Sequence, residues 1–210
     1  MILTPDNEYA VVLDACVLVP MPLCDTLLRL AEEPALYRPL WSDPILEEVA
    51  RVLRARLALT AEQVARRIGV MQKAFPEAIV GIPEGFTDGI HGIDAKDRHV
   101  VAAAVLARAN AIVSLNQKHF PADHLDPYGI LLQTPNSFLV HQFHLNPDLI
   151  LEKLDAQAAA RRMETAGCCR VAPSCCTGIC RTCKGTLMMR NKRAPRSQPG
   201  TAQENPWNSG

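Results

Sequence analysis

The chain has 210 residues, which allows one sizeable domain plus an appendage. Its 22 Lys and Arg balance 22 Asp and Glu, so bulk charge does not indicate a strongly basic nucleic-acid binder. No stretch approaches the roughly 18 apolar residues of a membrane span. The apolar run 11–20 follows no basic segment, which is unlike a signal peptide. These features exclude a membrane-spanning class and predict a cytoplasmic protein.

Charge and cysteine are distributed unevenly along the chain. Residues 1–161 hold 14 Lys and Arg against 20 Asp and Glu, whereas residues 162–210 hold 8 against 2. Six of the eight cysteines lie between Cys168 and Cys183. A secreted disulfide scaffold would spread its cysteines through the fold. We therefore expect a domain at 1–161 and an irregular, disordered tail at 162–210 that is basic and rich in cysteine.

The first half of the chain shows strand and helix patterns in alternation. Ser42 or Asp43 followed by Pro44 is typical of a helix start. Thr60 and Gln63 have the spacing of a capping box. The expected elements are a buried strand at 9–13, an amphipathic helix at 23–32, a short strand at 36–41, a helix from 43, a helix from 61 to about 75, and a short strand at 78–82.

The second half continues this alternation. Asp94 is in position to cap a helix at 95–109, whose middle is apolar almost all round and should be buried. Strands are expected at 111–115 and 129–133, followed by helices that begin at Pro135 and Pro147 and end near residues 144 and 161. Strands alternating with helices predict an α/β fold with helices on both faces of the sheet.

Four polar residues lie at the ends of these elements. Asp14 and Asn116 each follow a predicted strand, Glu48 lies in the helix opened at residue 43, and Asp97 lies in the first turn of the apolar helix. Ligands gather at the carboxyl edge of such sheets, so Asp14 and Asn116 should share that edge if their strands are neighbours. Carboxylates are costly to gather without a positive partner. The pattern predicts a site for a divalent cation.

The segments that carry these residues resemble the successive motifs of PIN domains, in particular the bacterial toxin-like group related to VapC. The likeness covers about residues 8–161, and four motifs in order make it specific. They are Val11-Val-Leu-Asp-Ala-Cys-Val-Leu18, Ser42-Asp-Pro-Ile-Leu-Glu-Glu-Val-Ala-Arg-Val-Leu53, Asp94-Ala-Lys-Asp-Arg-His-Val-Val-Ala-Ala-Ala104 and Ile112-Val-Ser-Leu-Asn-Gln-Lys-His-Phe120. The resemblance implies a three-layer α/β/α fold with a mainly parallel sheet. It also implies a ribonuclease that uses Mg²⁺ or Mn²⁺, ions that prefer oxygen ligands.

Carried over by position, Asp14 would be the central metal ligand, Glu48 the acid from a helix, Asp97 the third acid and Asn116 the last polar group. Glu47 is the weaker choice for the second acid, since it lies about 100° around the helix from its neighbour. Asp94 is given a capping role first and a metal role second. Asn116 and His119 stand where many relatives carry acids, which lowers the negative charge of the site.

The resemblance also implies an RNA substrate, a small antitoxin partner that blocks the acidic site, and a possible homodimer. The alternative is a PIN-like protein without turnover that binds RNA or protein. Other enzyme classes fit poorly. No glycine-rich turn follows the first strand, Cys16 stands where an aspartate-based phosphatase needs a second acid, and Ser114 has no matching His and Asp.

Two further groups of residues have either a structural or a functional interpretation. Arg51, Arg54, Arg56, Arg66 and Arg67 could meet a phosphate backbone, but a solvated helix face is favoured. His141 and His144, on a predicted helix, are interpreted as surface or core residues rather than ligands.

Three interpretations of the tail remain open. Cys180 and Cys183, with Cys175 or Cys176, have spacing that a zinc site could use. A basic RNA-binding arm is the second interpretation. The preferred one is an out-of-frame continuation of a gene that once encoded a helical end, which the other reading frames of the DNA would test.

Overall fold

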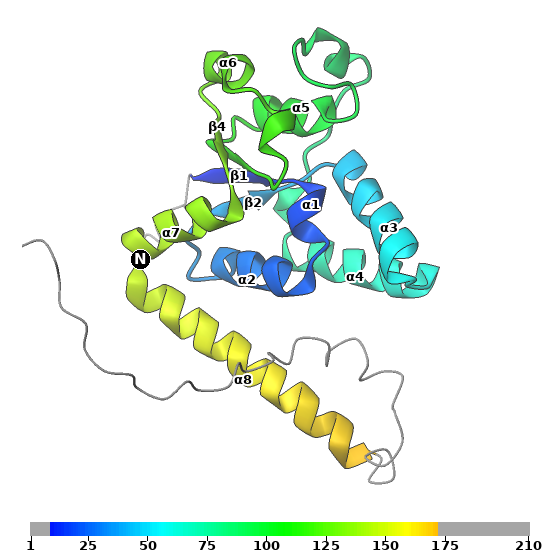
Figure 1. Cartoon of the computed structure of the whole chain (residues 1–210), viewed down its shortest axis with the longest axis vertical. Helices are drawn as coiled ribbons and strands as arrows, with labels where there is room; N and C mark the ends of the chain where they lie inside the picture. The colour runs from blue at the N-terminus through cyan, green and yellow to red at the C-terminus, as the bar shows by residue number, and fades with distance from the viewer. Residues whose placement is uncertain (1–8, 172–210) are drawn as a thin grey trace, which may run out of the picture. The chain divides into compact units, whose positions relative to one another are not determined.

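Four parallel strands form the centre of the fold, in the order β2-β1-β3-β4 (Figure 1). The computed structural model describes the backbone of residues 9–171 and the side chains of residues 9–160. The strands are β1 (Ala10–Leu13), β2 (Arg38–Leu40), β3 (Ala111–Val113) and β4 (Leu131–Gln133). Val12 pairs with Leu40 on one side and Ile112 on the other. All four residues of β1 are buried, as expected for a central strand covered on both faces.

Helices cover both faces of this sheet, which gives the expected three layers. Over the described residues the α-helices are α1 (Ala15–Leu18), α2 (Met21–Ala31), α3 (Asp43–Leu57), α4 (Ala61–Ala74), α5 (Arg98–Leu106), α6 (Ala122–Leu125), α7 (Pro135–Leu145) and α8 (Pro147–Val171). The 3₁₀ turns are η1 (Pro76–Ala78), η2 (Phe86–Gly89), η3 (Gln117–His119) and η4 (Asp126–Tyr128).

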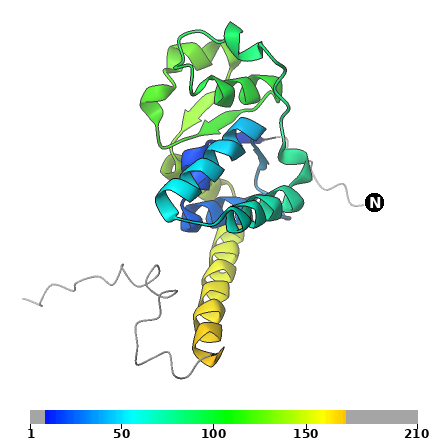
Figure 2. The same ribbon diagram turned by 90° about the vertical axis from the view of Figure 1, so that its right-hand side faces the viewer.

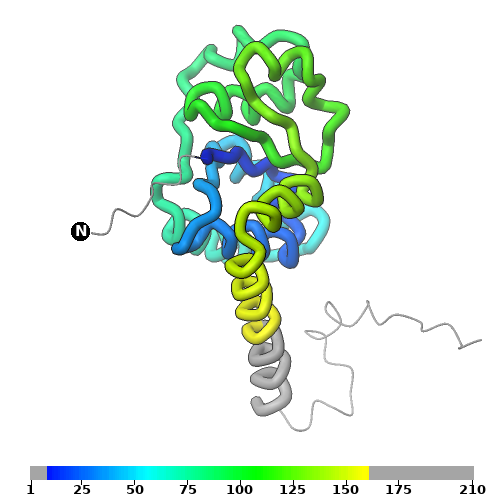
Figure 3. The backbone as a smooth tube through the Cα atoms, turned by 90° about the vertical axis from the view of Figure 1, so that its left-hand side faces the viewer, coloured from blue at the N-terminus to red at the C-terminus, as the bar shows by residue number. Residues whose placement is uncertain are grey.

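The helices divide between the two faces of the sheet. Figure 1 shows α5 and α6 on one side of the sheet and α2 and α7 on the other. Helices α3 and α4 pack against each other, and the short helix α1 packs against both α2 and α3 (Figure 2). Helix α7 follows β4 and packs against it (Figure 3). The α/β/α architecture predicted from the sequence is confirmed.

Aromatic side chains fill the core beside β2. The Tyr37 and Phe138 rings meet edge to face with centroids 4.9 Å apart, and Trp41 meets Phe75 in the same way at 6.0 Å. The buried Tyr37 hydroxyl donates a hydrogen bond to the Leu27 carbonyl at 2.8 Å, so its polar end does not go unpaired. These contacts fix α2 and α7 against the sheet.

Three elements differ from the sequence-based expectation. The short helix α1 has four residues, too few to show a periodic pattern. Instead of a strand at 78–82, a single bridge joins Ile79 to Trp41, because η1 precedes it and Pro83 follows soon after. The last helix continues to Val171 rather than ending near residue 161. Arg161, Arg162, Met163 and Glu164 are good helix formers that favour continuation of the helix, and no proline interrupts it before Val171.

The start of α5 is the fourth difference. The helix begins at Arg98 with Asp97 at the N-cap position, whereas Asp94 lies outside it. The Asp94 carboxylate accepts a long hydrogen bond from the Lys96 N–H at 3.4 Å, and the Asp94 carbonyl accepts from the Asp97 N–H at 2.8 Å. The predicted capping role of Asp94 is therefore wrong, because a tight turn precedes the helix.

Contacts along the chain divide it into two units, at Met1–Arg161 and Arg162–Gly210. The zinc and basic-arm interpretations concern positions 172–210 almost entirely, which lie outside the described residues. Within the described part of the chain, no helix is both long enough and apolar enough to cross a membrane.

Candidate active site

Asp14 lies at the carboxyl edge of the sheet, between β1 and α1. Its backbone N–H donates to the Val113 carbonyl of β3 at 3.1 Å. Its side chain is nearly buried, with the residue 6% exposed. The paired strands β1 and β3 therefore bring the residues after them together, as the sequence argument required for Asp14 and Asn116.

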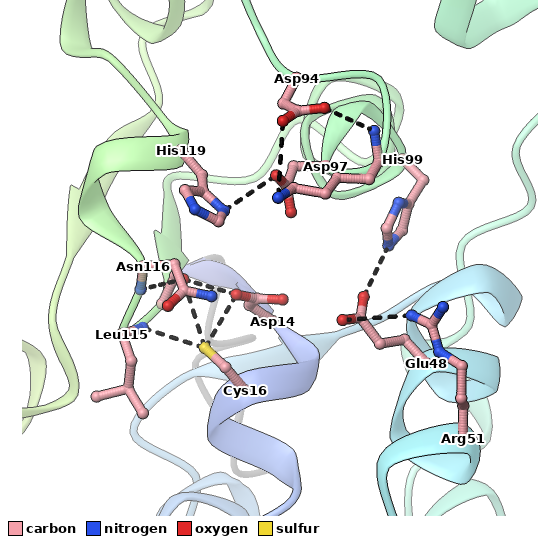
Figure 4. A network of polar contacts seen from close by, with 12 residues as sticks. Asp14, Cys16, Glu48, Arg51, Asp94, Asp97, His99, Leu115, Asn116 and His119 are labelled. Carbon is pink, nitrogen blue, oxygen red and sulfur yellow. Dashed lines mark hydrogen bonds and ion pairs between the residues drawn. The ribbon is translucent and has the colours of Figure 1, made fainter. Parts of the chain in front are cut away.

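Two side chains donate hydrogen bonds to the same Asp14 oxygen. The Ser114 hydroxyl donates to Oδ2 at 2.6 Å, and the Cys16 thiol donates to it at 3.0 Å. The Ser114 oxygen accepts from the Asn116 N–H at 3.0 Å, while the Cys16 sulfur accepts from the Leu115 N–H at 3.1 Å. This network fixes the Asp14 carboxylate against the end of β3 (Figure 4).

Ser114 was missed as a site residue by sequence reasoning, which considered it only as a nucleophile. The signal that could have found it is its place directly after β3, at the same edge as Asp14. Burial and the Asp14 charge raise the pKa of Cys16 to about 12. Cys16 is therefore a neutral thiol near pH 7 and a hydrogen-bond donor rather than a nucleophile.

Asp97 approaches from the start of α5, and one of its oxygens points toward Asp14 in Figure 4. Its side chain is 15% exposed, and its Oδ2 lies 3.1 Å from Nδ1 of His119. Burial raises the pKa of Asp97 above its usual value, and the charges of Asp14 and Asp94 act in the same direction. His119 and Lys96 oppose that rise without cancelling it. The carboxylates of Asp14 and Asp97 thus repel each other electrostatically.

Glu48 reaches the site from α3. Its carboxylate lies 3.9 Å from Nε2 of His99 and 3.7 Å from the Arg51 guanidinium. Its side chain is 33% exposed, whereas Glu47 belongs to the exposed residues. Figure 4 shows Glu48 joined to His99 on one side and to Arg51 on the other, and the Arg51 side chain is 72% exposed. The geometry favours Glu48 over Glu47 as the candidate acid, and the helical spacing predicts that the two do not face the same side.

Asn116 lies just before η3 and is exposed. Its N–H donates to Ser114, which ties this position to the Asp14 network. The structure thus places Asp14, Asp97 and Asn116 around the ends of β1 and β3, with Glu48 beside them on α3. Asp94 stays at the outer rim, where its carboxylate is 3.6 Å from the Lys96 ammonium.

The arginine and histidine groups divide into structural and exposed members. Arg67 donates hydrogen bonds from Nη2 to the Leu18 and Val19 carbonyls, which completes the end of α1. Arg54, Arg56 and Arg66 are exposed. His141, an exposed residue of α7, contacts the Gln133 side-chain amide at 2.9 Å. Only Arg51 of this set contacts a candidate site residue.

Three buried polar atoms of the site lack a hydrogen-bond partner: Oδ2 of Asp97, Nε2 of His99 and Nδ1 of His119. Such groups are costly unless a cation or water meets them. Among the described side chains, however, no three His, Cys, Asp or Glu groups stand close enough to hold a metal ion by themselves. The unpartnered Oδ2 of Asp97 beside Asp14 suits a divalent ion that also binds water, as Mg²⁺ usually does with one or two carboxylates.

Comparison with known proteins identifies the family of the chain. A profile of the PIN domain matches residues 10–118, just over half of the chain. The chain belongs to the PIN domain family. The matched segment contains Asp14, Glu48, Asp97 and Asn116, and the expected family and fold are thereby confirmed.

One relative is Putative ribonuclease VapC50 of Mycobacterium tuberculosis. It is 49% identical over 65 residues, which cover 29% of this chain and 38% of that protein. The match thus spans well under half of the relative's length. It supports the VapC-related grouping that the motifs indicated.

Proposed function

We propose that this protein is a metal-dependent endoribonuclease that hydrolyses RNA phosphodiester bonds, as the toxin of a type II toxin–antitoxin pair. The observation that carries this proposal is the juxtaposition of Asp14 and Asp97 at the carboxyl edge of the sheet. Burial and mutual repulsion raise the pKa of Asp97, and a divalent cation would relieve both costs. Membership of the PIN domain family supports nuclease chemistry. The relative from Mycobacterium tuberculosis is itself named a putative ribonuclease.

Asp14, Asp97, Glu48 and Asn116 would hold Mg²⁺ or Mn²⁺, directly or through water. An ion held there would lower the pKa of an attacking water and offset charge that builds on the phosphate. Ser114 and Cys16 keep the Asp14 carboxylate in one orientation. His99 and Arg51 flank Glu48 with groups that can neutralise its charge. The chain itself thus supplies orientation and electrostatic balance.

Asp97→Asn tests the proposal in the full chain with a mixed RNA pool. Wild type should cleave the pool with Mn²⁺ or Mg²⁺ and not with EDTA. The amide keeps the shape of Asp97 but removes its charge, so cleavage should fall by at least about 100-fold, an effect of about 2.7 kcal/mol on the barrier.

Glu48→Gln and Glu47→Gln form a matched pair on α3. Both remove one carboxylate, but only Glu48 lies beside His99. We expect the first to abolish most cleavage and the second to leave it near wild type. Near-wild-type cleavage by both variants would contradict a role for Glu48 in the site.

The proposed partner is a small antitoxin that covers the acidic site, and a homodimer is a further expectation of the resemblance. A short reading frame beside this gene would supply the candidate antitoxin. Its product should co-purify with the chain and stop RNA cleavage. Light scattering of the purified chain would report whether it dimerises.

The alternative is a PIN-like protein that binds RNA or protein without turnover. RNA binding that persists in wild type, Asp14→Ala and Asp97→Asn alike, without cleavage under any divalent ion, would favour it. The reduced negative charge at Asn116 and His119 is the feature that keeps this alternative in view.

A further inference from the structure

His119 occupies an unusual place beside the acids. It is the last residue of η3, and its N–H donates to the Asn116 carbonyl at 3.0 Å. This turn directs its ring toward the start of α5 (Figure 4), where Nδ1 lies 3.1 Å from Oδ2 of Asp97. The side chain is 36% exposed, but its Nδ1 is buried. The two atoms that face each other are therefore both shielded from water.

The contact between these atoms does not have hydrogen-bond geometry. At 3.1 Å the pair is close enough, yet neither atom has a hydrogen-bond partner. A proton on Nδ1 is expected to point along the line to the carboxylate oxygen. Two ligands at right angles around an ion, each about 2.1 Å away, lie about 3.0 Å apart. The separation suits two neighbouring ligands of one cation.

We propose that Nδ1 of His119 and Oδ2 of Asp97 bind the same divalent ion, and that this nitrogen ligand makes the site prefer Mn²⁺ to Mg²⁺. Imidazole nitrogen suits transition-metal ions, whereas Mg²⁺ favours oxygen ligands. No third His, Cys, Asp or Glu among the described residues completes a cluster with this pair, so water and phosphate oxygens would fill the other positions. Asp14, Glu48 and Asn116 would then act on the ion through bound water. The inference rests on the proposed function in taking a divalent ion as the ligand.

A purely structural ion pair is the competing explanation. A protonated His119 would neutralise Asp97 and take the place of a cation. Removing the imidazole would then leave Mn²⁺ affinity unchanged or raise it, because a competitor for Asp97 is lost. The proposal predicts the opposite direction, which makes the two explanations separable by binding alone.

Binding of Mn²⁺ and Mg²⁺ to the full chain should be measured by calorimetry for wild type, His119→Asn and His119→Asp. Loss of a nitrogen ligand should weaken Mn²⁺ binding by at least about tenfold, as even second-shell changes do. Mg²⁺ binding should change much less in His119→Asn. It should strengthen in His119→Asp, which supplies an oxygen ligand. His144→Asn, at an exposed position on α7, is the matched control and should match wild type.

Electron spin-echo spectra of the Mn²⁺-loaded protein give a readout independent of activity. Wild type should show nitrogen modulation that changes when histidine is labelled with ¹⁵N. His119→Asn should lose this modulation, and His144→Asn should keep it. Unchanged modulation or unchanged Mn²⁺ affinity in His119→Asn overturns the inference. Circular dichroism of each variant separates a local loss from unfolding.

The proposed function fails by a different result. If wild type cleaves RNA with Mn²⁺ but shows no nitrogen modulation, the inference about His119 fails and the nuclease proposal stands. If the modulation is present and no divalent ion supports cleavage, the nuclease proposal fails and the ligand assignment stands.

Discussion

Asp14 depends on two donors of unequal strength. A hydroxyl forms a shorter and stronger hydrogen bond to a carboxylate than a thiol does, and the distances of 2.6 Å for Ser114 and 3.0 Å for Cys16 follow that order. Both donors also accept a backbone N–H from the segment after β3. Each side chain therefore links the central acid to a different point of the same loop.

Ser114→Ala should lower RNA cleavage by about tenfold or more, because a hydrogen bond to a charged group contributes about 1.5–3 kcal/mol. Cys16→Ser keeps a donor at the second position and should retain activity. Single-turnover cleavage rates at saturating Mn²⁺ measure both. Equal rates for wild type and Ser114→Ala would show that this hydroxyl does not position Asp14.

Cys16 should react slowly with iodoacetamide in the folded protein. Its pKa of about 12 leaves little thiolate at pH 8, whereas an ordinary thiol with a pKa of about 8.5 is roughly one quarter thiolate there. Raising the pH toward 12 should therefore speed alkylation so long as the fold persists. Peptide mass spectrometry follows this site separately from the other cysteines. Rapid labelling at pH 8 without denaturant would contradict the shielded-thiol description.

The sequence predicted that Asp14 and Asn116 lie at one edge of the sheet, but it did not predict which side chains contact the acids. Asp14 and Asn116 could be placed at one edge because strand ends in parallel sheets converge, and β1 and β3 are neighbours. The contact of His119 with Asp97, and that of His99 with Glu48, depend on how η3, α3 and α5 pack. Packing between elements that are far apart in the chain does not produce a periodic pattern in the sequence.

At the scale of elements, local chemistry predicts helix starts when the capping atoms are close in sequence. The capping box of α4 is present as expected: the Gln63 N–H donates to the Thr60 hydroxyl at 3.2 Å, and the Thr60 N–H donates to the Gln63 side chain at 2.9 Å. At α5, the turn after Asp94 shifts the start to Arg98. That turn depends on the loop before it, which has no comparable signature.

Thr60→Ala should lower the free energy of unfolding by about 1 kcal/mol, since it removes the acceptor for the Gln63 N–H. The melting temperature should fall by about 2–4 °C for a chain of this size. Thr60→Ser retains the cap and is the matched control. Thermal unfolding by circular dichroism measures both. A double-mutant cycle with Gln63→Ala should show coupling, because the two hydrogen bonds are reciprocal.

At the scale of the molecule, the hydrophobic core and the site belong to one stretch of chain. Among the described residues, the buried apolar side chains run from Ala10 to Ile150, and Met1–Arg161 forms one compact unit. The first part of α8 is tied to α2: Lys153 donates from Nζ to the Arg29 and Glu32 carbonyls at 2.8 and 2.7 Å. Gln157 donates from Nε2 to the Asp25 carboxylate at 2.7 Å, so a second residue of α8 is also tied to α2.

A chain that ends at residue 161 should therefore fold and keep the RNA cleavage that we propose for the full chain. It retains every core residue that is buried in the described part of the chain, and the contacts of Lys153 and Gln157 with α2. Its melting temperature should lie within about 2 °C of the full chain, a change in unfolding free energy of at most about 1 kcal/mol. A chain that ends at residue 150 is the informative counterpart. It lacks Lys153 and Gln157, so the carbonyls at the end of α2 lose the hydrogen bonds from Lys153. This shorter chain should melt several degrees lower. If the 161-residue chain fails to fold or to cleave RNA, the segment after Arg161 must take part in the domain, and the proposed boundary at 161 is wrong.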